Sequence, residues 1–450
     1  MPLLSLTLRL PLARCAWVVG LAVASFAAHS QSLQALYEAA RAYDATYLAA
    51  RSQAESAQYR RDQAYALRRP SVGLTAGASR VGTDLPRVGE NGYATQLEAA
   101  VSARQPLYNR SNSATIDQAE RGYDVAMADL ENAEQDLIVR LTQAYFDVLS
   151  AQDTLGTARA NKTAIAEQLA SAKRNFEVGT ATITDTREAQ ARFDLATAQE
   201  IAADNDLRTK RIALDLLVGR SNVTPQPLAV PVQMPQLAPT NVDDWVQFAS
   251  VSPNVRKAQL AYDVAKLETE KARAGHLPTV DLVGSYGKQN NDSLVGAPAG
   301  TLFIPGTTTQ ASIGVQMNLP LYAGHSVQNR IKETLALEEK SRNDLDAARR
   351  IVTQSTRQAF LGVQSGEASV RALEAAEASS KLALEATQLG YKVGVRVNLD
   401  VLNAQTQLYT TQRDLARARY DLILTNLRLR QAAGTLKPED VSSVNRLLTP

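Results

Sequence analysis

The sequence predicts a mainly α-helical protein with a small β part, built from two tandem copies of one unit. Three observations predict this class: an internal repeat, two proline-free stretches long enough for very long helices, and two pairs of alternating segments. Self-similarity at a fixed offset is the mark of a repeated architecture, so it decides the fold class. The composition agrees: apolar residues reach 45% but aromatics only 5%, as in long helices that pack through small side chains.

The repeat is clearest in two segments. Residues 176–219 align with 391–434 without a gap, at a constant offset of 215, and ten of forty-four positions are identical. They open with "FEVGTATITD" and "YKVGVRVNLD", each with an aromatic residue three positions before a glycine and an Asp six positions after it. We therefore divide the chain into repeat 1 (31–220), a proline-rich linker (221–241), repeat 2 (242–435) and a short tail (436–450) that we expect to be irregular.

The same order of elements is expected in both repeats. Pro70 and Pro278 end a first helical stretch (33–68 and 253–275). A β-hairpin follows (71–105 and 279–319). A long helix comes next (about 112–178 and about 325–393), and sixty-seven residues would extend for about 100 Å. A return helix completes each repeat (about 183–218 and about 398–433).

The hairpin strands alternate with period two, which indicates one apolar and one polar face. We expect the following residues on the apolar face: Val72, Leu74, Ala76, Ala78, Leu97, Ala99, Val101, Ala103, Val280, Leu282, Gly284, Tyr286, Ala311, Ile313, Val315 and Met317. The strands run for about 11–13 residues, enough to cross a bilayer when tilted. The intervening positions are small or polar, as in the wall of a water-filled lumen.

The second return helix predicts how the helices pack. Five apolar residues recur every seven positions: Val401, Leu408, Leu415, Leu422 and Leu429. A stripe of small residues lies beside them. A sustained seven-residue period favours a left-handed coiled coil. The alternative is a single buried helix in an ordinary bundle.

Residues 1–30 are expected to be a signal peptide. Arg9 and Arg14 precede an apolar run at 15–28, and "AHS" at 28–30 is a small-x-small cleavage site. The alternative is a membrane-spanning helix, for which the run is short. Without this segment the chain has equal numbers of acidic and basic residues and no cysteine, since Cys15 is the only one. This indicates an exported protein with no bulk attraction for nucleic acid.

Four strands with one apolar face cannot stand alone in lipid, because open edges leave backbone groups without partners. Four strands cannot close a barrel either, and barrels of about eight strands are filled by their own side chains. The strands must therefore be shared between chains. Three chains would supply twelve strands and leave room for a channel.

Taken together, the signal peptide, the duplicated units, the paired "PLY" closures (106–108 and 320–322) and the two glycine motifs resemble the TolC family of outer-membrane channel-tunnels. The similarity covers 31–435, and "VGVRVNLDVLNAQTQLY" (393–409) is its most specific segment. The resemblance implies a homotrimer in outer-membrane lipid, with a twelve-stranded transmembrane barrel and a long antiparallel coiled-coil α-barrel across the periplasm. It also implies a periplasmic adaptor (membrane fusion protein) and an inner-membrane pump of the RND, ABC or MFS type as partners.

The glycine motifs have a structural explanation that needs no family. Gly179 and Gly394 permit the positive φ of a helical corner. Thr182, Thr184 and Asn398 can cap the returning helices. Asp185 and Asp400 lie near the first turn of these helices, where a carboxylate suits the helix dipole.

The resemblance adds functional roles at these bends, which it places at a closed periplasmic mouth. It implies a gate network of Asp185, Thr184, Tyr391 and Arg396. Asp400 matches an acidic constriction ring, while Asn403 is neutral where a second acidic ring can stand, so we expect less attraction for cations. The hairpin tips, which an adaptor would touch, comprise Val178, Gly179, Val393, Gly394 and Arg396. The alternative for Arg396 is a solvated charge at a helix end.

The leading hypothesis is thus an exit duct for efflux or type I secretion, closed by hydrogen bonds and salt bridges at the tips. The alternative is a periplasmic coiled-coil scaffold or adhesin without channel activity, which leaves the apolar hairpin faces without a purpose. We expect no enzyme and no cofactor or metal. His276 and His325 are the histidines outside the signal segment, and the chain has no HExxH motif or phosphate-binding glycine loop.

Overall fold

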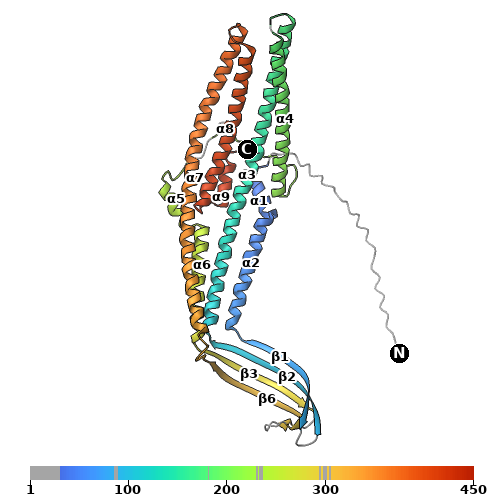
Figure 1. Cartoon of the computed structure of the whole chain (residues 1–450), viewed down its shortest axis with the longest axis vertical. Coiled ribbons are helices and arrows are strands. Elements are labelled where there is room, and N and C mark those ends of the chain that lie inside the picture. Colours follow the sequence, from blue (N-terminus) through green and yellow to red (C-terminus); the bar gives the residue numbers. More distant parts are fainter. Residues whose placement is uncertain are drawn as a thin grey trace, which may run out of the picture.

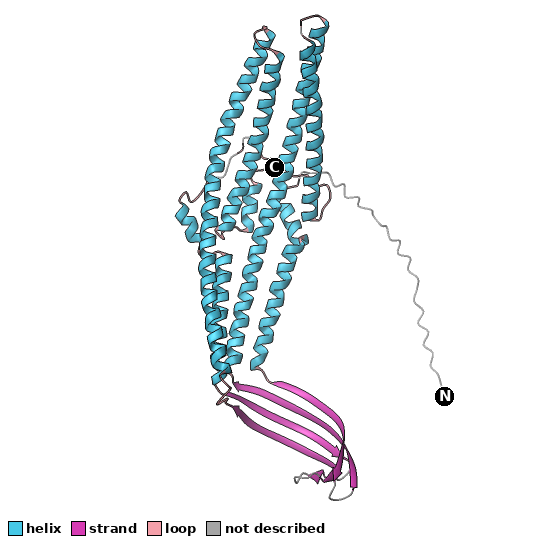
Figure 2. Ribbon diagram, in the orientation of Figure 1, coloured by secondary structure: helices cyan, strands magenta, loops and turns pink. Residues whose placement is uncertain are grey.

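The computed structural model describes residues 31–85, 90–180, 182–229, 232, 237–292, 295–296, 302–303 and 306–449. The expected signal peptide, 1–30, lies outside the described residues. The described chain is mainly helical with one main sheet, which confirms the predicted fold class (Figure 2). The helices form an elongated body, with the sheet at one end and two helical bends at the other (Figure 1).

Each repeat contributes the same series of elements. Repeat 1 contains α1 (Leu33–Tyr43), α2 (Ala45–Tyr65), β1 (Ser71–Leu85), β2 (Glu90–Tyr108), α3 (Arg110–Glu177) and α4 (Ile183–Val218). Repeat 2 contains α5 (Val242–Ala249), α6 (Pro253–Arg273), β3 (Thr279–Asn291), β6 (Gly306–Asn318), α7 (Ser326–Lys392) and α8 (Asn398–Ala432). Short 3₁₀ turns, η1 (Ala66–Arg68) and η2 (Ala274–His276), precede the hairpins, and β4 (Val295–Gly296) pairs with β5 (Leu302–Phe303).

Two helices, α3 and α7, run through the whole helical body. Beside the sheet they pack against α2 and α6, and toward the bends they pack against α4 and α8 (Figure 1). Contacts also join α3 to α6 and to α8, so the two repeats form one wall. None of the helices in the described ranges combines the length and apolar character needed to cross a bilayer.

The sheet has the order β1-β2-β3-β6 and is antiparallel throughout. Its register confirms the predicted faces. Across the four strands, one row pairs Leu74, Val101, Tyr286 and Ala311. On the other face, a polar row pairs Gly73, Ser102, Ser285 and Ser312, and the last two hydroxyls lie 2.8 Å apart.

The strands β1 and β2 are longer than predicted, at 15 and 19 residues. The predicted length of 11–13 residues was too short because it included only the positions that clearly alternate. On the polar face, Arg104 of β2 and Asp281 of β3 form an ion pair with a separation of 2.6 Å. The two repeats are therefore joined inside the sheet by hydrogen bonds and by this charge pair.

The largest hydrophobic core lies midway along the helices, where α1, α3, α4, α8 and α9 (Pro438–Asn445) meet. Leu33, Tyr145, Leu214 and Ile423 are almost wholly buried there. The Tyr145 hydroxyl accepts the Gln226 amide proton at 2.7 Å, which holds the proline-rich linker against α3. We call this region the equatorial core.

The return helix α8 packs as its period predicts. Val401, Leu408, Leu415, Leu422 and Leu429 are all buried, with at most 8% exposure. The expectation of an irregular tail is wrong over α9. Asp440 accepts the Lys437 amide proton at 2.9 Å and pairs with Arg430 at 2.6 Å, while Val441 and Val444 are buried.

The first helical stretch, expected to be continuous, breaks at Asp44 into α1 and α2. Asp44 caps α2 by accepting the Tyr47 amide proton at 2.8 Å, and it receives two hydrogen bonds from Arg140 of α3, both at 3.1 Å. Burial alone would raise the pKa of Asp44. The hydrogen bonds from Arg140 and from the backbone outweigh burial and hold this pKa below its usual range.

We expect Asp44→Asn to lower the free energy of unfolding by about 1–3 kcal/mol at neutral pH, from loss of a charged hydrogen-bond acceptor at a helix cap. A carboxyl whose pKa is depressed in the fold stabilises it above the unfolded pKa, near 4, and loses this effect as pH falls through the folded value. The stability difference between wild type and variant should therefore shrink below about pH 4. Unfolding curves measured from pH 7 to pH 2 test this, and a pH-independent difference would contradict it.

Candidate functional site at the hairpin tips

Both helical bends are built in the same way. Gly179 follows α3 with φ +77°, and Gly394 follows α7 with φ +80°. Beyond them, the Thr180 amide donates to the Asn175 carbonyl at 2.8 Å, and the Val395 amide donates to the Gly390 carbonyl at 2.9 Å. This is the Schellman end, in which a left-handed glycine turns the chain back. A Cβ at Gly179 or Gly394 would meet no atom within 4 Å, so these glycines serve the backbone alone.

In the first tip, Asp185 belongs to a capping box with Thr182. The Thr182 hydroxyl accepts the Asp185 amide proton at 3.2 Å, and Asp185 Oδ2 accepts the Thr182 amide and hydroxyl protons at 2.9 and 2.8 Å. The prediction that Thr182 caps α4 is confirmed. Thr184 lies exposed on the first turn and is not the cap.

The second tip is capped differently. The N-cap position is Val397, which offers no side-chain acceptor, so the predicted cap at Asn398 is wrong. Asn398 is buried, and its Oδ1 has no hydrogen-bond partner in the described structure. Arg396 instead reaches along the helix to Asp400, with 3.6 Å between Nη1 and Oδ2. The Arg396 side chain is 60% exposed, so this pair contributes little stability by itself.

Among the described residues, two side-chain hydrogen bonds connect the first helical hairpin to the second near the tips. The Asn175 side-chain amide of α3 donates to the Tyr391 hydroxyl of α7 at 3.2 Å. One turn or more into the return helices, the Arg192 guanidinium of α4 donates to Asn403 Oδ1 of α8 at 3.3 Å. The sequence interpretation did not identify Asn175 or Arg192. Asn175 could have been noticed by comparing the repeats, because it stands at the position of Gly390.

A cleft of about 430 Å³ lies between the two tips. Its lining includes three of the predicted gate residues, Asp185, Tyr391 and Arg396, together with Asn175 and Asn398. In the described part of the chain no ion pair joins Asp185 to Arg396. Val178 and Val393 lie at the ends of the bends, and both are strongly exposed, at 72% and 65%.

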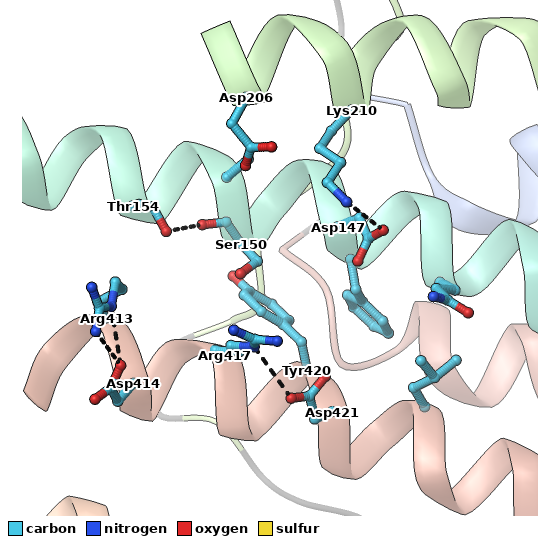
Figure 3. A pocket seen from close by; sticks show the side chains of 14 residues that line it. Asp147, Ser150, Thr154, Asp206, Lys210, Arg413, Asp414, Arg417, Tyr420 and Asp421 are labelled. Carbon is cyan, nitrogen blue, oxygen red and sulfur yellow. Dashed lines mark hydrogen bonds and ion pairs between the residues drawn. The ribbon is translucent and has the colours of Figure 1, made fainter. Parts of the chain in front are cut away.

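A second cleft, of about 520 Å³, lies nearer the equatorial core between α3, α4 and α8 (Figure 3). Its charged side chains largely neutralise one another in these pairs: Lys210 with Asp147 at 3.2 Å, Arg413 with Asp414 at 2.8 Å, and Arg417 with Asp421 at 3.7 Å. No group of three or more His, Cys, Asp or Glu side chains suited to a metal ion occurs within the described ranges. The described acidic and basic side chains of this cleft thus form a surface of mixed charge on the helical wall.

In the lining of this cleft, Tyr420 of α8 donates to Asp153 of α3 at 2.6 Å and stacks on Phe146, with 5.3 Å between ring centroids. Burial raises the pKa of the Tyr420 hydroxyl, and the neighbouring carboxylate raises it further. Tyr420 therefore stays protonated and remains a donor. This contact joins the first helical hairpin to the second at the level of the equatorial core.

Long helical hairpins that end in a sheet with one exposed apolar face indicate a protein that contacts a membrane. Comparison with known proteins agrees. The family model described as outer membrane efflux protein matches residues 23–220 and 246–435. The chain belongs to the outer membrane efflux protein family.

Two curated relatives show how far the similarity extends. The chain is 33% identical over 425 residues to outer membrane protein TolC of Vibrio cholerae, covering 94% of each chain. It is 33% identical over 356 residues to the alkaline protease secretion protein AprF of Pseudomonas aeruginosa, covering 77% of this chain and 71% of the relative. The family is one of channel or transport proteins of the outer membrane.

Solved structures show the same fold at low identity. The CmeC outer membrane channel of Campylobacter jejuni superposes with a TM-score of 0.77 at 16% identity, covering 99% of this chain and 98% of that one. The outer membrane protein VceC of Vibrio cholerae superposes with a TM-score of 0.76 at 19% identity, covering 89% and 96%. These structures agree in fold, and the family places the protein in the outer membrane with a large periplasmic part.

Proposed function

We propose that three copies of this chain form one outer-membrane exit duct, which receives substrates from a periplasmic adaptor and an inner-membrane pump. The observation that carries the proposal is the four-stranded sheet, which has an apolar face and edges at β1 and β6. Ile313 and Leu74 on that face are 82% and 73% exposed in the single chain. A sheet with this exposure is stable in lipid only if its edges pair with further strands.

The helical wall supports the same assembly. Within one chain the helices follow the order α4, α3, α8, α7, so α4 and α7 flank the wall near the tips. Both carry exposed large apolar side chains: Leu195, Ile201, Ile212 and Leu216 on α4, and Ile351, Leu361, Leu382 and Leu389 on α7. A neighbouring chain packed along these two flanking helices would cover such exposed apolar side chains. We propose that α4 of one chain packs against α7 of the next.

Cysteine cross-linking tests this assembly. Ile212 lies 29 residues from the tip end of α4, and Leu361 lies 31 residues from the tip end of α7. We expect Ile212→Cys combined with Leu361→Cys to give covalent trimers on oxidation in outer-membrane fractions. Pairing Ile212→Cys with Leu382→Cys is the control, because Leu382 lies 21 residues further toward the tip, or about 31 Å along the helix. Recovery of uncross-linked monomer from both pairs would contradict the assembly.

We also propose that the tips form a periplasmic gate, with Asp185, Thr184, Tyr391 and Arg396 in its network. The cleft between the tips supports this, because it gathers the polar groups of Asp185, Tyr391 and Arg396 in one lining. Charged hydrogen bonds are worth about 1.5–3 kcal/mol each, so a docking partner can outweigh a few of them. A packed apolar core at the tips would not open so easily.

The constriction next to the gate would be nearly neutral. Asp400 faces the cation of Arg396, and Asn403 accepts from Arg192 instead of adding a second carboxylate. We propose weak preference for cations as a consequence. The exposed apolar side chains of Val178 and Val393, beside Gly179, Gly394 and Arg396, would meet the adaptor.

Planar-bilayer recordings separate this function from a coiled-coil scaffold or adhesin. A duct gives unitary conductance steps, while a scaffold gives none. The names of the relatives include both an alkaline protease secretion protein and a probable efflux pump outer membrane protein, which supports either efflux or type I secretion as the system served.

A further inference from the structure

The last turn of α7 contains a glycine, Gly390, and the side chain of Arg396 fills the space that a side chain at position 390 would take. The Gly390 carbonyl accepts amide protons from Val395 at 2.9 Å and from Arg396 at 3.2 Å, so the bend folds back over this residue. A Cβ built on Gly390 would lie 2.8 Å from Arg396 Cγ and 3.5 Å from Arg396 Cβ. The first distance is shorter than real Cβ contacts, so the aliphatic stem of Arg396 crosses α7 where only glycine leaves room.

The backbone does not require glycine here. Gly390 lies within the helix and is absent from the glycines with positive φ, which include Gly179 and Gly394. Glycine inside a helix costs about 1 kcal/mol relative to alanine, so the residue needs another reason. Gly156, inside α3, has nothing within 4 Å of a built Cβ and shows what a helical glycine without such a contact looks like.

The equivalent position in repeat 1 is Asn175, 215 residues earlier. Its carbonyl makes the corresponding bond, from Thr180, but it carries a side chain, which donates to Tyr391 of the other tip. In repeat 1 the large side chain therefore stands on the helix. In repeat 2 the large side chain belongs to the bend, at Arg396, and the helix has a glycine at the equivalent position, Gly390.

We propose that Gly390 is a positioning residue for the gate: it seats the stem of Arg396 so that the guanidinium lies over the cleft shared with Asp185 and near Asp400. The inference rests on the proposed gate. A methyl group at position 390 forces Arg396 into another rotamer and moves its charge away from this place, while the helix itself gains propensity. Gly390→Ala should thus weaken the gate without weakening the fold.

The test is a double-mutant cycle on full-length trimers in planar bilayers, with open probability as the readout. We expect Gly390→Ala to raise open probability by about threefold or more. The upper limit is the effect of losing one charged hydrogen bond. In the Arg396→Ala background, Gly390→Ala should add nothing, because the clashing Cγ is gone and Cβ sits at an ordinary 3.5 Å. Gly156→Ala, the matched control, should leave open probability unchanged.

Each outcome decides between the two proposals. If Arg396→Ala opens the channel and Gly390→Ala does not, the positioning role is wrong and the gate stands. If Gly390→Ala opens it equally in both backgrounds, the methyl group acts on the bend and not through Arg396, which also overturns the role. If Arg396→Ala has no effect, the gate and the positioning role both fail.

Recovery of the variants adds a second measurement. If Gly390→Ala trimers are not recovered, the same substitution with Arg396→Ala should restore them, because the contact has been removed. Failure of both variants to assemble would contradict the proposal.

Discussion

Replacing Gly434 with alanine is expected to destabilise the chain by about 2–5 kcal/mol, far more than the same change at Gly394. Both glycines have positive φ, +70° and +80°. A Cβ at Gly434, however, would lie 2.6 Å from Cα and Cβ of Ser252 and 2.9 Å from Cδ of Pro253. Backbone and a proline ring cannot move aside as a flexible side chain can, so the cost of the clash adds to that of the left-handed conformation.

Thermal unfolding followed by circular dichroism gives the comparison. Gly394→Ala should cost only the left-handed strain, about 1–2 kcal/mol, because its Cβ meets nothing within 4 Å. Gly219, the equivalent of Gly434 in repeat 1, should be intermediate: its Cβ would meet the ring of Tyr43, an exposed side chain that can turn away. Equal losses at Gly434 and Gly394 would show that the close packing of this bend against Ser252 and Pro253 does not require a glycine.

Arg396→Ala is expected to raise the open probability of the channel by about ten- to a hundredfold, the equivalent of one charged hydrogen bond. Arg208→Ala is the control. Arg208 is also an exposed arginine that pairs with an Asp one turn away, Asp204 at 2.7 Å, but it lies far from the tip on α4. Unchanged single-channel behaviour in Arg396→Ala would show that Arg396 is only a solvated charge at the end of a helix.

Asp185 needs a different substitution, because it also caps α4. Alanine would remove the capping box together with the charge, and any increase in conductance could come from a frayed helix. Asp185→Asn keeps an oxygen that can accept from the Thr182 amide, so it removes the charge with less damage to the cap. We expect Asp185→Asn to raise open probability in the same direction as Arg396→Ala. A rise in Asp185→Ala alone would assign Asp185 to helix capping and not to the gate.

Local patterns were enough to predict much of this fold. The left-handed corners at Gly179 and Gly394 need only a glycine between two helical patterns. The apolar positions of the strands follow from a period of two, and the register places these positions on one face of the sheet. The buried stripe of α8 follows from five apolar residues, Val401 to Leu429, that are spaced by seven positions.

The features that were missed depend on residues far apart in the chain. Asp44 divides the first helix, and the ion pair that stabilises this break comes from Arg140, 96 positions later. The tail folds into α9 because the equatorial core receives Val441 and Val444, and the Ser442 hydroxyl donates to Gln34 of α1, 408 positions earlier. Likewise, the bonds from Asn175 to Tyr391 and from Arg192 to Asn403 span 216 and 211 positions. No local period or motif encodes such partners.

The continuity of α3 and α7 through the equatorial core makes each helix a lever. From Tyr145 in the core to Glu177 at the tip, α3 runs for 32 residues, or about 48 Å. A rotation of about 5° around the core would move the tip by about 4 Å, more than the length of a hydrogen bond. The sheet on the other side of the pivot could stay fixed in its lipid. In the proposed gate, an adaptor that applies a slight torque near the bends would therefore separate the polar contacts of the tips without unfolding a helical turn.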